Sequence, residues 1–213
     1  MTIHADQLYK CTKTVDGVEK YMLRPISFEV GAGEHVLVTG ASGSGKTTLL
    51  SLIAGLSKPT GGTVTLTGEE GDPENTGVCS MLFQENRLLP ELSAVRNIQV
   101  VLPKHYAGRR NESREPLEKV IRDHLGRLLP GVSRDKPAAE LSGGEKRRVA
   151  LVRAVLAPGE VLLLDEPFTG LDDASIRNVK EYIRQETEGR TVLLTDHEGV
   201  HFPDWRKIHV EAG

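Results

Sequence analysis

Residues 40–47 form a glycine-rich run, Gly-Ala-Ser-Gly-Ser-Gly-Lys-Thr, which ends in a lysine and a hydroxyl side chain. Glycines at this spacing let backbone N–H groups converge on an anion, and Lys46 places a positive charge between the β- and γ-phosphates of a nucleotide. Thr47 can bind Mg²⁺ through its hydroxyl. The run predicts a nucleotide-phosphate loop whose candidate ligands are Gly40, Ser42, Gly43, Gly45, Lys46, Thr47 and Thr48.

The segments on both sides of this run support that interpretation. His35 to Thr39 is a candidate for a short strand, and Lys46 to Leu56 suits a helix. A phosphate bound between a strand and a helix gains from the partial positive charge of the helix N-terminus. A glycine-rich turn that matches by chance lacks this context, so the functional interpretation is preferred.

A second candidate cluster is acidic. Residues 161–164 are Val-Leu-Leu-Leu, and Asp165 and Glu166 follow directly. Asp165, at the end of an apolar strand, can hold Mg²⁺ through its water shell, and Glu166 can point at the γ-phosphate and orient the attacking water. On its own, Asp-Glu-Pro after a strand is typical of a solvated turn. Together with the phosphate loop, it predicts a site for nucleotide hydrolysis.

A third motif narrows the class of protein, because a phosphate loop and an acidic strand end occur in many kinases, GTPases and helicases. Residues 141–145 are Leu-Ser-Gly-Gly-Glu, and an apolar helical stretch follows. Ser142 would cap a helix that has two glycines behind it, which makes a second anion-binding helix end. The motif, placed between the other two, resembles the LSGGQ-type signature of ABC ATPases, with Glu at its last position. Its candidate ligands are Ser142, Gly143 and Gly144.

Three further positions match the motif order of that family. Gln84 resembles the Q-loop glutamine, which in the family contacts Mg²⁺ and lies near the transmembrane partner. Thr169-Gly-Leu-Asp172 resembles the D-loop, which in the family crosses to the opposite subunit. His197 resembles the switch histidine that hydrogen-bonds the γ-phosphate. The resemblance thus implies Glu166, His197 and Gln84 as catalytic residues, Thr47, Gln84 and Asp165 as metal ligands, and Asp172 as a nucleotide-site residue.

The sequence departs from the family pattern in two places. The family usually has Ser or Thr before the switch histidine and Asp after it, whereas this chain has Asp196 and Glu198. The extra carboxylate either raises the pKa of the histidine or faces solvent. The family also stacks an aromatic ring on adenine, but the stretch from Thr12 to Gly17 contains none. Tyr9 and Tyr21 flank it, and we expect both on strands.

The spacing of apolar residues predicts an α/β fold. Strands are expected at Ile26 to Val30, His35 to Thr39, Thr63 to Thr67, Gly77 to Phe83, Val161 to Leu164 and Thr191 to Thr195. Helices are expected at Lys46 to Leu56, Glu145 to Leu156 and Asp173 to Glu186, with an all-helical insert from about Leu88 to Leu129.

We therefore expect a P-loop NTPase with a parallel-core sheet, an N-terminal antiparallel β part and an inserted helical subdomain. The whole chain, 1–213, is expected to form one domain. In it, residues 1–87 and 157–213 form the ATP-binding core and residues 88–156 form the helical signature subdomain.

Composition restricts partners and location. The formal net charge is −3 and the isoelectric point is about 6.2, so nothing indicates nucleic acid as a partner. The only cysteines, Cys11 and Cys79, are far apart and fit free thiols in a reducing compartment. The apolar runs are far shorter than the roughly 18 residues that span a bilayer. We expect a cytoplasmic chain whose membrane role depends on a partner.

The resemblance implies the ATP-binding and ATP-hydrolysing subunit of an ABC transporter, which uses ATP and Mg²⁺ and powers a separate integral-membrane permease. It further implies a homodimer or a pair of ATPase subunits that sandwich ATP between the Lys46 loop of one chain and the Ser142 signature of the other. Such a chain sits at the inner face of the membrane through its permease. Residues 83–98 resemble the corresponding segment of nitrate, sulfonate and taurine-type importer ATPases.

One alternative is a soluble, non-transport ABC ATPase that acts in DNA repair or on ribosomes. Such proteins usually carry long coiled-coil insertions or two cassettes in one chain, and the sequence has neither. A plain nucleotide-binding or kinase module is excluded by the Ser142 signature. The transported substrate, the direction of transport and the permease are not encoded in these motifs.

Overall fold

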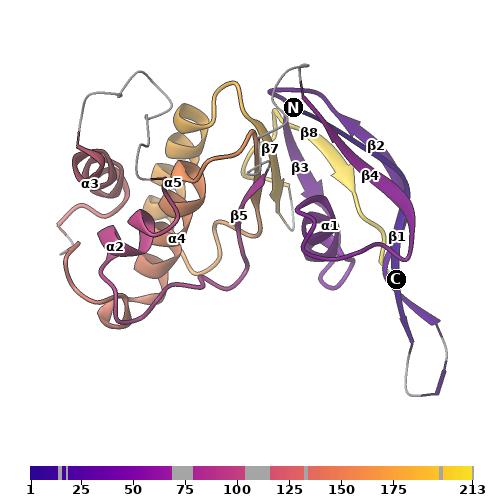
Figure 1. Ribbon diagram of the computed structural model, residues 1–213, viewed down its shortest axis with the longest axis horizontal. Helices are drawn as coiled ribbons and strands as arrows, with labels where there is room; N and C mark the ends of the chain where they lie inside the picture. Colours follow the sequence, from indigo (N-terminus) through magenta and orange to yellow (C-terminus); the bar gives the residue numbers. More distant parts are fainter. Residues whose placement is uncertain are drawn as a thin grey trace. The chain divides into compact units, whose positions relative to one another are not determined.

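The structure is a computed structural model that describes residues 1–13, 16–17, 19–68, 79–103, 116–131, 134–196 and 199–212. The chain forms two compact units. The first contains Met1–Gln84, Gly159–Glu166 and Thr187–Gly213, and the second contains Glu85–Pro158 and Pro167–Glu186. The second unit therefore holds the helical region expected at 88–156 together with residues 167–186, which the sequence placed in the ATP-binding core. Figure 1 labels the elements.

The first unit contains a parallel sheet with the strand order β5-β6-β7-β3-β8. These strands are β3 (His35–Thr39), β5 (Cys79–Leu82), β6 (Val161–Leu164), β7 (Thr191–Thr195) and β8 (Arg206–His209). Every residue of β6 and β7 is buried, as expected for central strands of a parallel sheet, which is covered on both faces. The order brings the ends of β3, β6 and β7 to one edge of the sheet, where ligands of open α/β sheets bind.

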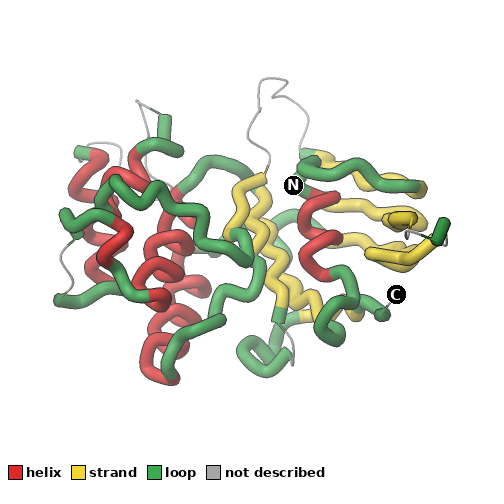
Figure 2. The backbone as a smooth tube through the Cα atoms, turned by 90° about the horizontal axis from the view of Figure 1, so that it is seen from below, coloured by secondary structure: helices red, strands yellow, loops and turns green. Residues whose placement is uncertain are grey.

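An antiparallel sheet completes the first unit, with β1 (Thr2–Lys13) between β2 (Glu19–Val30) and β4 (Gly61–Thr67). Figures 1 and 2 place α1 (Lys46–Ile53) between the two sheets of this unit. One hydrophobic core joins all three layers, including Ile3 of β1, Leu49 of α1 and Leu163 of β6. The helix that follows the phosphate loop is therefore fixed from both sides.

The second unit contains α2 (Ala94–Gln99), α3 (Leu117–Leu128), the short 3₁₀ helix Ala138–Glu140, α4 (Gly143–Leu156) and α5 (Asp173–Glu186). In α3, the buried side chains Val120, Ile121, Leu125 and Leu128 follow helical spacing. The buried ring of His124 lies 2.9 Å, Nδ1 to Oη, from Tyr182 of α5, so these two helices share a polar contact inside the unit.

The predicted fold class is confirmed, and several predicted elements have the observed bounds: His35 to Thr39, Val161 to Leu164, Asp173 to Glu186 and Thr191 to Thr195. Other boundaries were wrong. The predicted helix Lys46 to Leu56 ends earlier, at Ile53, because Gly55 adopts a positive φ of 69° directly after the cap residue. Val101, which was expected on the apolar face of a helix, lies outside α2 and is 41% exposed.

Candidate active site

The phosphate loop joins β3 to α1, as predicted. Gly40, Gly43 and Gly45 have φ values of 148°, 77° and 104°, a region that side-chain-bearing residues rarely adopt. A Cβ atom on Gly40 would overlap the carbonyl oxygen of Val210, and one on Gly45 would overlap that of Met22. The loop keeps its path next to β2 and β8 only because these positions lack side chains.

Lys46 begins α1 and is 5% exposed. Its ammonium group donates to the carbonyl oxygens of Gly40, at 2.8 Å, and Ala41, at 2.9 Å. The positive charge is thus held over the loop that the glycines shape. Ser44, inside the same loop, is 1% exposed, and its hydroxyl has no hydrogen-bond partner among the described residues. A buried polar atom without a partner is uncommon and fits a loop built around an anionic ligand.

The other candidate ligands of the loop lie on its open side. Ser42, Gly43 and Thr47 are exposed, and Thr48 is half-buried in the first turn of α1. The loop thus combines a buried cation with accessible backbone and hydroxyl groups, which is the composition that a nucleotide triphosphate requires.

Asp165 directly follows β6 and is fully buried. Its backbone N–H donates to the Leu82 carbonyl at 3.0 Å, and its Oδ1 accepts a hydrogen bond from the Thr195 hydroxyl at 2.8 Å. Glu166, half-buried, has a φ of 49°, and its N–H donates to the same Thr195 hydroxyl at 2.8 Å. Sequence reasoning missed Thr195, whose only signal is a polar residue that ends the apolar run of β7.

The donor set fits Mg²⁺ bound together with a nucleotide. Among the described residues, no group of three or more His, Cys, Asp or Glu side chains is arranged to hold a metal. Mg²⁺ in nucleotide sites typically keeps several waters and uses one or two protein oxygens plus substrate phosphates. One buried carboxylate, Asp165, and one accessible hydroxyl, Thr47, meet that need. Gln84 is exposed two residues after β5, and its predicted role at the metal stays a prediction.

The segment after β7 carries the predicted switch histidine. His197 lies outside the described residues, so its contact with the γ-phosphate stays a prediction. Its neighbour Asp196 is 7% exposed, which makes the solvent-facing alternative wrong. The Asp196 Oδ2 accepts the backbone N–H of His201 at 3.1 Å and lies 2.9 Å from the Nδ1 of that ring. The aspartate therefore anchors the backbone at His201, which follows His197 in the sequence.

The signature residues form the start of α4 in the second unit. Ser142 is the N-cap, and its hydroxyl accepts the Glu145 N–H at 3.2 Å. The Glu145 carboxylate accepts the Ser142 N–H in return, at 2.7 Å, and this bond lowers the pKa of Glu145. Glutamate at the last position of the signature thus closes a reciprocal capping box, in which Glu and Gln are both accepted. A Cβ on Gly143 would meet nothing within 4 Å, so the helix N-terminus is accessible there.

Asp172 belongs to the same unit and directly precedes α5. Its carboxylate accepts the backbone N–H of Ser175 at 2.8 Å, which lowers the pKa of Asp172. Arg148 of α4 donates to the Ser175 hydroxyl at 3.0 Å, so the D-loop candidate and the signature helix share a network. The structure therefore groups the predicted residues in two sets, with the phosphate loop, Asp165 and Glu166 in one unit and Ser142 and Asp172 in the other.

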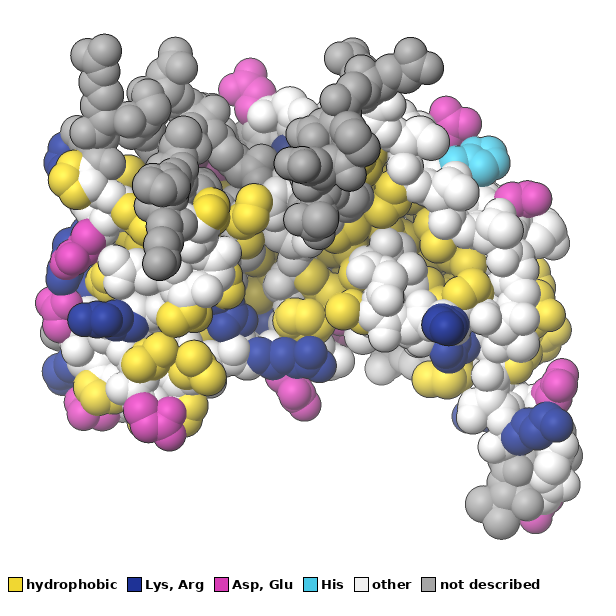
Figure 3. Space-filling model, in the orientation of Figure 1, with side chains coloured by type: hydrophobic (Ala, Val, Ile, Leu, Met, Phe, Trp, Pro, Cys, Tyr) yellow, Lys and Arg dark blue, Asp and Glu magenta, His cyan; other side chains and the backbone are white. Residues whose placement is uncertain are grey.

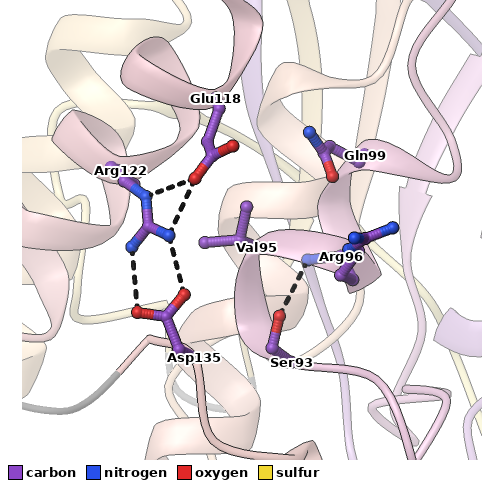
Figure 4. Close-up of a pocket in the computed structure, with 7 residues that line it drawn as sticks. All are labelled: Ser93, Val95, Arg96, Gln99, Glu118, Arg122 and Asp135. Atoms are coloured by element: carbon purple, nitrogen blue, oxygen red, sulfur yellow. Dashed lines mark hydrogen bonds and ion pairs between the residues drawn. The ribbon is translucent and has the colours of Figure 1, made fainter.

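The second unit also has a polar pocket of about 340 Å³, lined by Ser93, Val95, Arg96, Gln99, Glu118, Arg122 and Asp135. Figure 4 shows Arg122 between Glu118 and Asp135, and the hydrogen bond to Asp135 is the main cause that raises the pKa of the guanidinium. None of the predicted nucleotide ligands lines this pocket. Its charges are largely satisfied within the unit, so we do not assign it to the nucleotide site.

No helix in the described part of the chain is long and apolar enough to cross a membrane.

Comparison with known proteins agrees with this geometry. The family model described as "ABC transporter" matches residues 23–169. The macrolide export ATP-binding/permease protein MacB of Mannheimia succiniciproducens is 36% identical over 187 residues, which cover 84% of this chain and 28% of MacB. The bicarbonate transport ATP-binding protein CmpC of Synechocystis sp. is 35% identical over 201 residues, which cover 92% of this chain and 29% of CmpC. The chain thus spans less than a third of the length of these relatives.

Two solved structures are similar over nearly the whole chain. One is a dimeric post-hydrolysis state of the ATP-binding cassette MJ0796 bound to ADP and Pi, with a TM-score of 0.83, 28% identity and coverage of 99% of this chain and 96% of that one. Another, a dimeric structure of MJ0796 described as a bacterial ABC transporter cassette, has the same TM-score and identity and covers 98% and 94%.

Proposed function

Because this chain belongs to the ABC transporter family, we propose that it is the ATP-binding and ATP-hydrolysing subunit of a transporter and that two chains work as a pair. One observation carries the proposal. The predicted hydrolytic residues Asp165 and Glu166 share a unit with the phosphate loop, whereas the second candidate anion-binding helix end, at Ser142, belongs to the other unit. A site that takes the phosphate-loop helix end from one chain and the Ser142 helix end from the other accounts for this division.

The residues of the first unit have distinct roles in the proposed reaction. The loop N–H groups and Lys46 bind the β- and γ-phosphates of ATP. Thr47, Asp165 and Gln84 would hold Mg²⁺, which neutralises phosphate charge when bound. Glu166 orients the attacking water and accepts its proton, and His197 contacts the γ-phosphate.

The second chain supplies the remaining groups. The N-terminus of α4, with Ser142, Gly143 and Gly144, brings N–H donors to the γ-phosphate, where negative charge is stabilised during hydrolysis. Asp172 is linked to Arg148 of the same helix through Ser175. The similar MJ0796 cassettes are dimeric, and one of them holds ADP and Pi, which supports the pairing of two chains.

A membrane permease is the partner that we propose for the pair. The MacB relatives are named as combined ATP-binding/permease proteins, and this chain spans only 28% of their length. In the helical unit, Leu89, Val100 and Val101 are 49%, 58% and 41% exposed. On the face of the helical unit that Figure 3 draws, hydrophobic side chains lie between charged ones. A contact there would hold the chain at the inner face of the membrane.

The transporter subtype is a finer proposal. The resemblance of residues 83–98 to nitrate, sulfonate and taurine-type importers, together with the likeness to CmpC, supports an importer of a small anion. MacB, an exporter with similar identity, supports the opposite direction. Purifying the native complex and identifying its membrane subunit decides between them. Recovery of the chain without any permease would favour the non-transport alternative.

The pairing is tested by mixing two inactive variants, Lys46→Ala and Ser142→Arg. If sites form between chains, a mixed pair has one site with both faults and one intact site. A 1:1 mixture should then recover about a quarter of the wild-type rate, since half of the pairs are mixed and half of their sites are intact. If each chain completes its own site, every site carries one fault. No recovery, together with a rate per chain that does not depend on concentration, would refute the paired mechanism.

A further inference from the structure

Thr195 lies where β7 meets the acidic strand end. The parallel register pairs Leu164 of β6 with Leu194 of β7, so Thr195 is beside Asp165 at the carboxyl edge of the sheet. The side chain of Thr195 is fully buried. A buried hydroxyl in an apolar strand has a desolvation cost that only specific partners offset.

The Thr195 hydroxyl has two partners on consecutive residues. It donates to Asp165 Oδ1 at 2.8 Å and accepts the Glu166 N–H at 2.8 Å. A hydroxyl has one donor hydrogen and two acceptor lone pairs, so it makes both bonds at once. One oxygen atom therefore links the proposed metal carboxylate to the backbone of the proposed catalytic glutamate.

Glu166 requires such a support. Its φ of 49° is in the left-handed region, which costs a residue with a Cβ free energy and persists only when the surroundings hold it. The Thr195 hydroxyl holds the amide of this residue. If the hydroxyl is lost, the Glu166 N–H loses its acceptor and the backbone is released toward negative φ, which redirects the carboxylate.

We propose that Thr195 is a positioning residue for ATP hydrolysis, whose hydroxyl orients both the Asp165 carboxylate and Glu166. The inference rests on the proposed function for the roles of those two residues. Because the phosphate loop does not touch this hydroxyl in any described contact, its loss should reduce turnover and spare ATP binding.

The chain contains a matched control at the other end of the same strand. Thr191 is also fully buried, and its hydroxyl accepts the Gly33 N–H at 3.0 Å and donates to the Met1 carbonyl at 2.6 Å. Thr191→Val therefore removes an equivalent hydroxyl from β7, away from the acidic strand end. It reports the general cost of that change to stability.

The first measurement uses protein without nucleotide. Hydrogen exchange of the Glu166 amide, followed by NMR, should be faster by roughly tenfold in Thr195→Val, since the amide loses its acceptor. Thr191→Val should leave this rate unchanged, and Thr195→Ser should restore it. Unchanged Glu166 exchange in Thr195→Val would overturn the inference without reference to catalysis.

The second measurement is steady-state hydrolysis with calorimetric ATP binding. Thr195→Val should lower kcat by about 10- to 100-fold, the usual cost of losing a group that orients an active-site ligand, and change ATP affinity less than about threefold. Thr195→Ser should recover most of kcat. If Thr195→Val does not fold, Thr195→Ser and Thr195→Ala give the same contrast, since they differ only by the hydroxyl.

The two proposals fail in different ways. Normal kcat in Thr195→Val, with Glu166→Gln inactive, overturns the role of Thr195 and leaves the proposed function intact. Normal hydrolysis in Glu166→Gln overturns the role of Glu166, while the exchange rate of its amide still tests the Thr195 contact. Equal losses in Thr195→Val and Thr191→Val would show only a structural role, and would also overturn the inference.

Discussion

Gly45→Ala should destabilise the protein before any nucleotide binds. Gly45 precedes α1 with φ 104° and ψ 14°, outside the left-handed well near φ 50–70° that other residues occasionally adopt. The added methyl would overlap the Met22 carbonyl oxygen and lie 3.2 Å from the Leu23 Cα, both backbone atoms of β2. Neither neighbour can rotate away, so β2 or the loop must move.

The size of the effect follows from a comparison with Gly43→Ala. Gly43 also has a positive φ, 77°, but a Cβ there would meet nothing within 4 Å. The left-handed backbone costs each alanine about 1–2 kcal/mol. Overpacking adds about 1–3 kcal/mol at Gly45 alone. The entropic gain of Gly→Ala in the unfolded chain is common to both variants and cancels.

Thermal unfolding of the nucleotide-free protein, followed by circular dichroism, measures the difference. At about 2–4 °C per kcal/mol for a chain of this size, Gly45→Ala should melt roughly 2–12 °C below Gly43→Ala. Calorimetry with ATP then tests whether the distorted loop also loses affinity. Equal melting temperatures, or a higher one for Gly45→Ala, would refute the close approach of the loop to β2.

Two other changes test the acidic groups. Glu166→Gln should keep ATP binding and lower the rate of hydrolysis by about a hundredfold or more. The control Glu160→Gln, at the other end of the same strand, should keep both ATP binding and hydrolysis. Equal hydrolysis rates in the two variants would contradict the catalytic role of Glu166. Glu145 has a folded pKa below its usual 4.5, so its capping-box stabilisation is present above that pH and is lost as pH falls through the folded value. Near neutral pH, the wild-type protein should therefore have a higher melting temperature than Glu145→Gln, and this difference should disappear below about pH 4.5. A difference in melting temperature that does not depend on pH would contradict this.

The central strands were predictable because local signals agreed at their ends. Val161 to Leu164 and Thr191 to Thr195 are short apolar runs, each with a Gly two residues before it and an Asp directly after it, so burial on both faces and strand length both follow from the sequence. The edge strand β8 was not predicted, because only Ile208 of Arg206–His209 is buried. Its pairing with β3 depends on the sheet and leaves no periodicity in the sequence.

The candidate site shows the same limit on what local sequence patterns can predict. Motif spacing located the phosphate loop, Asp165 and Ser142, since each sits at the end of an element that its neighbours in the sequence define. Thr195 was missed, and the role of Asp196 was left open between two alternatives, because the partners of both side chains are set by the folded structure. The Thr195 hydroxyl meets a carboxylate 30 residues away, and Asp196 turns to His201. Neither contact follows from a local pattern.

Sheet hydrogen bonds fix the backbone at the strand ends where the sequence places the candidate site. The backbone N–H of Asp165 donates to Leu82 at 3.0 Å, that of Asp196 to Val38 at 3.1 Å, and that of Val210 to Thr39 at 2.8 Å. Each bond continues the parallel ladder one residue beyond a named strand. The site backbone is therefore placed by the sheet, and loop conformation affects mainly the residues between these bonds. Differences from the family pattern should accordingly arise from side chains on this fixed backbone, such as Asp196, which stands where the family usually has Ser or Thr.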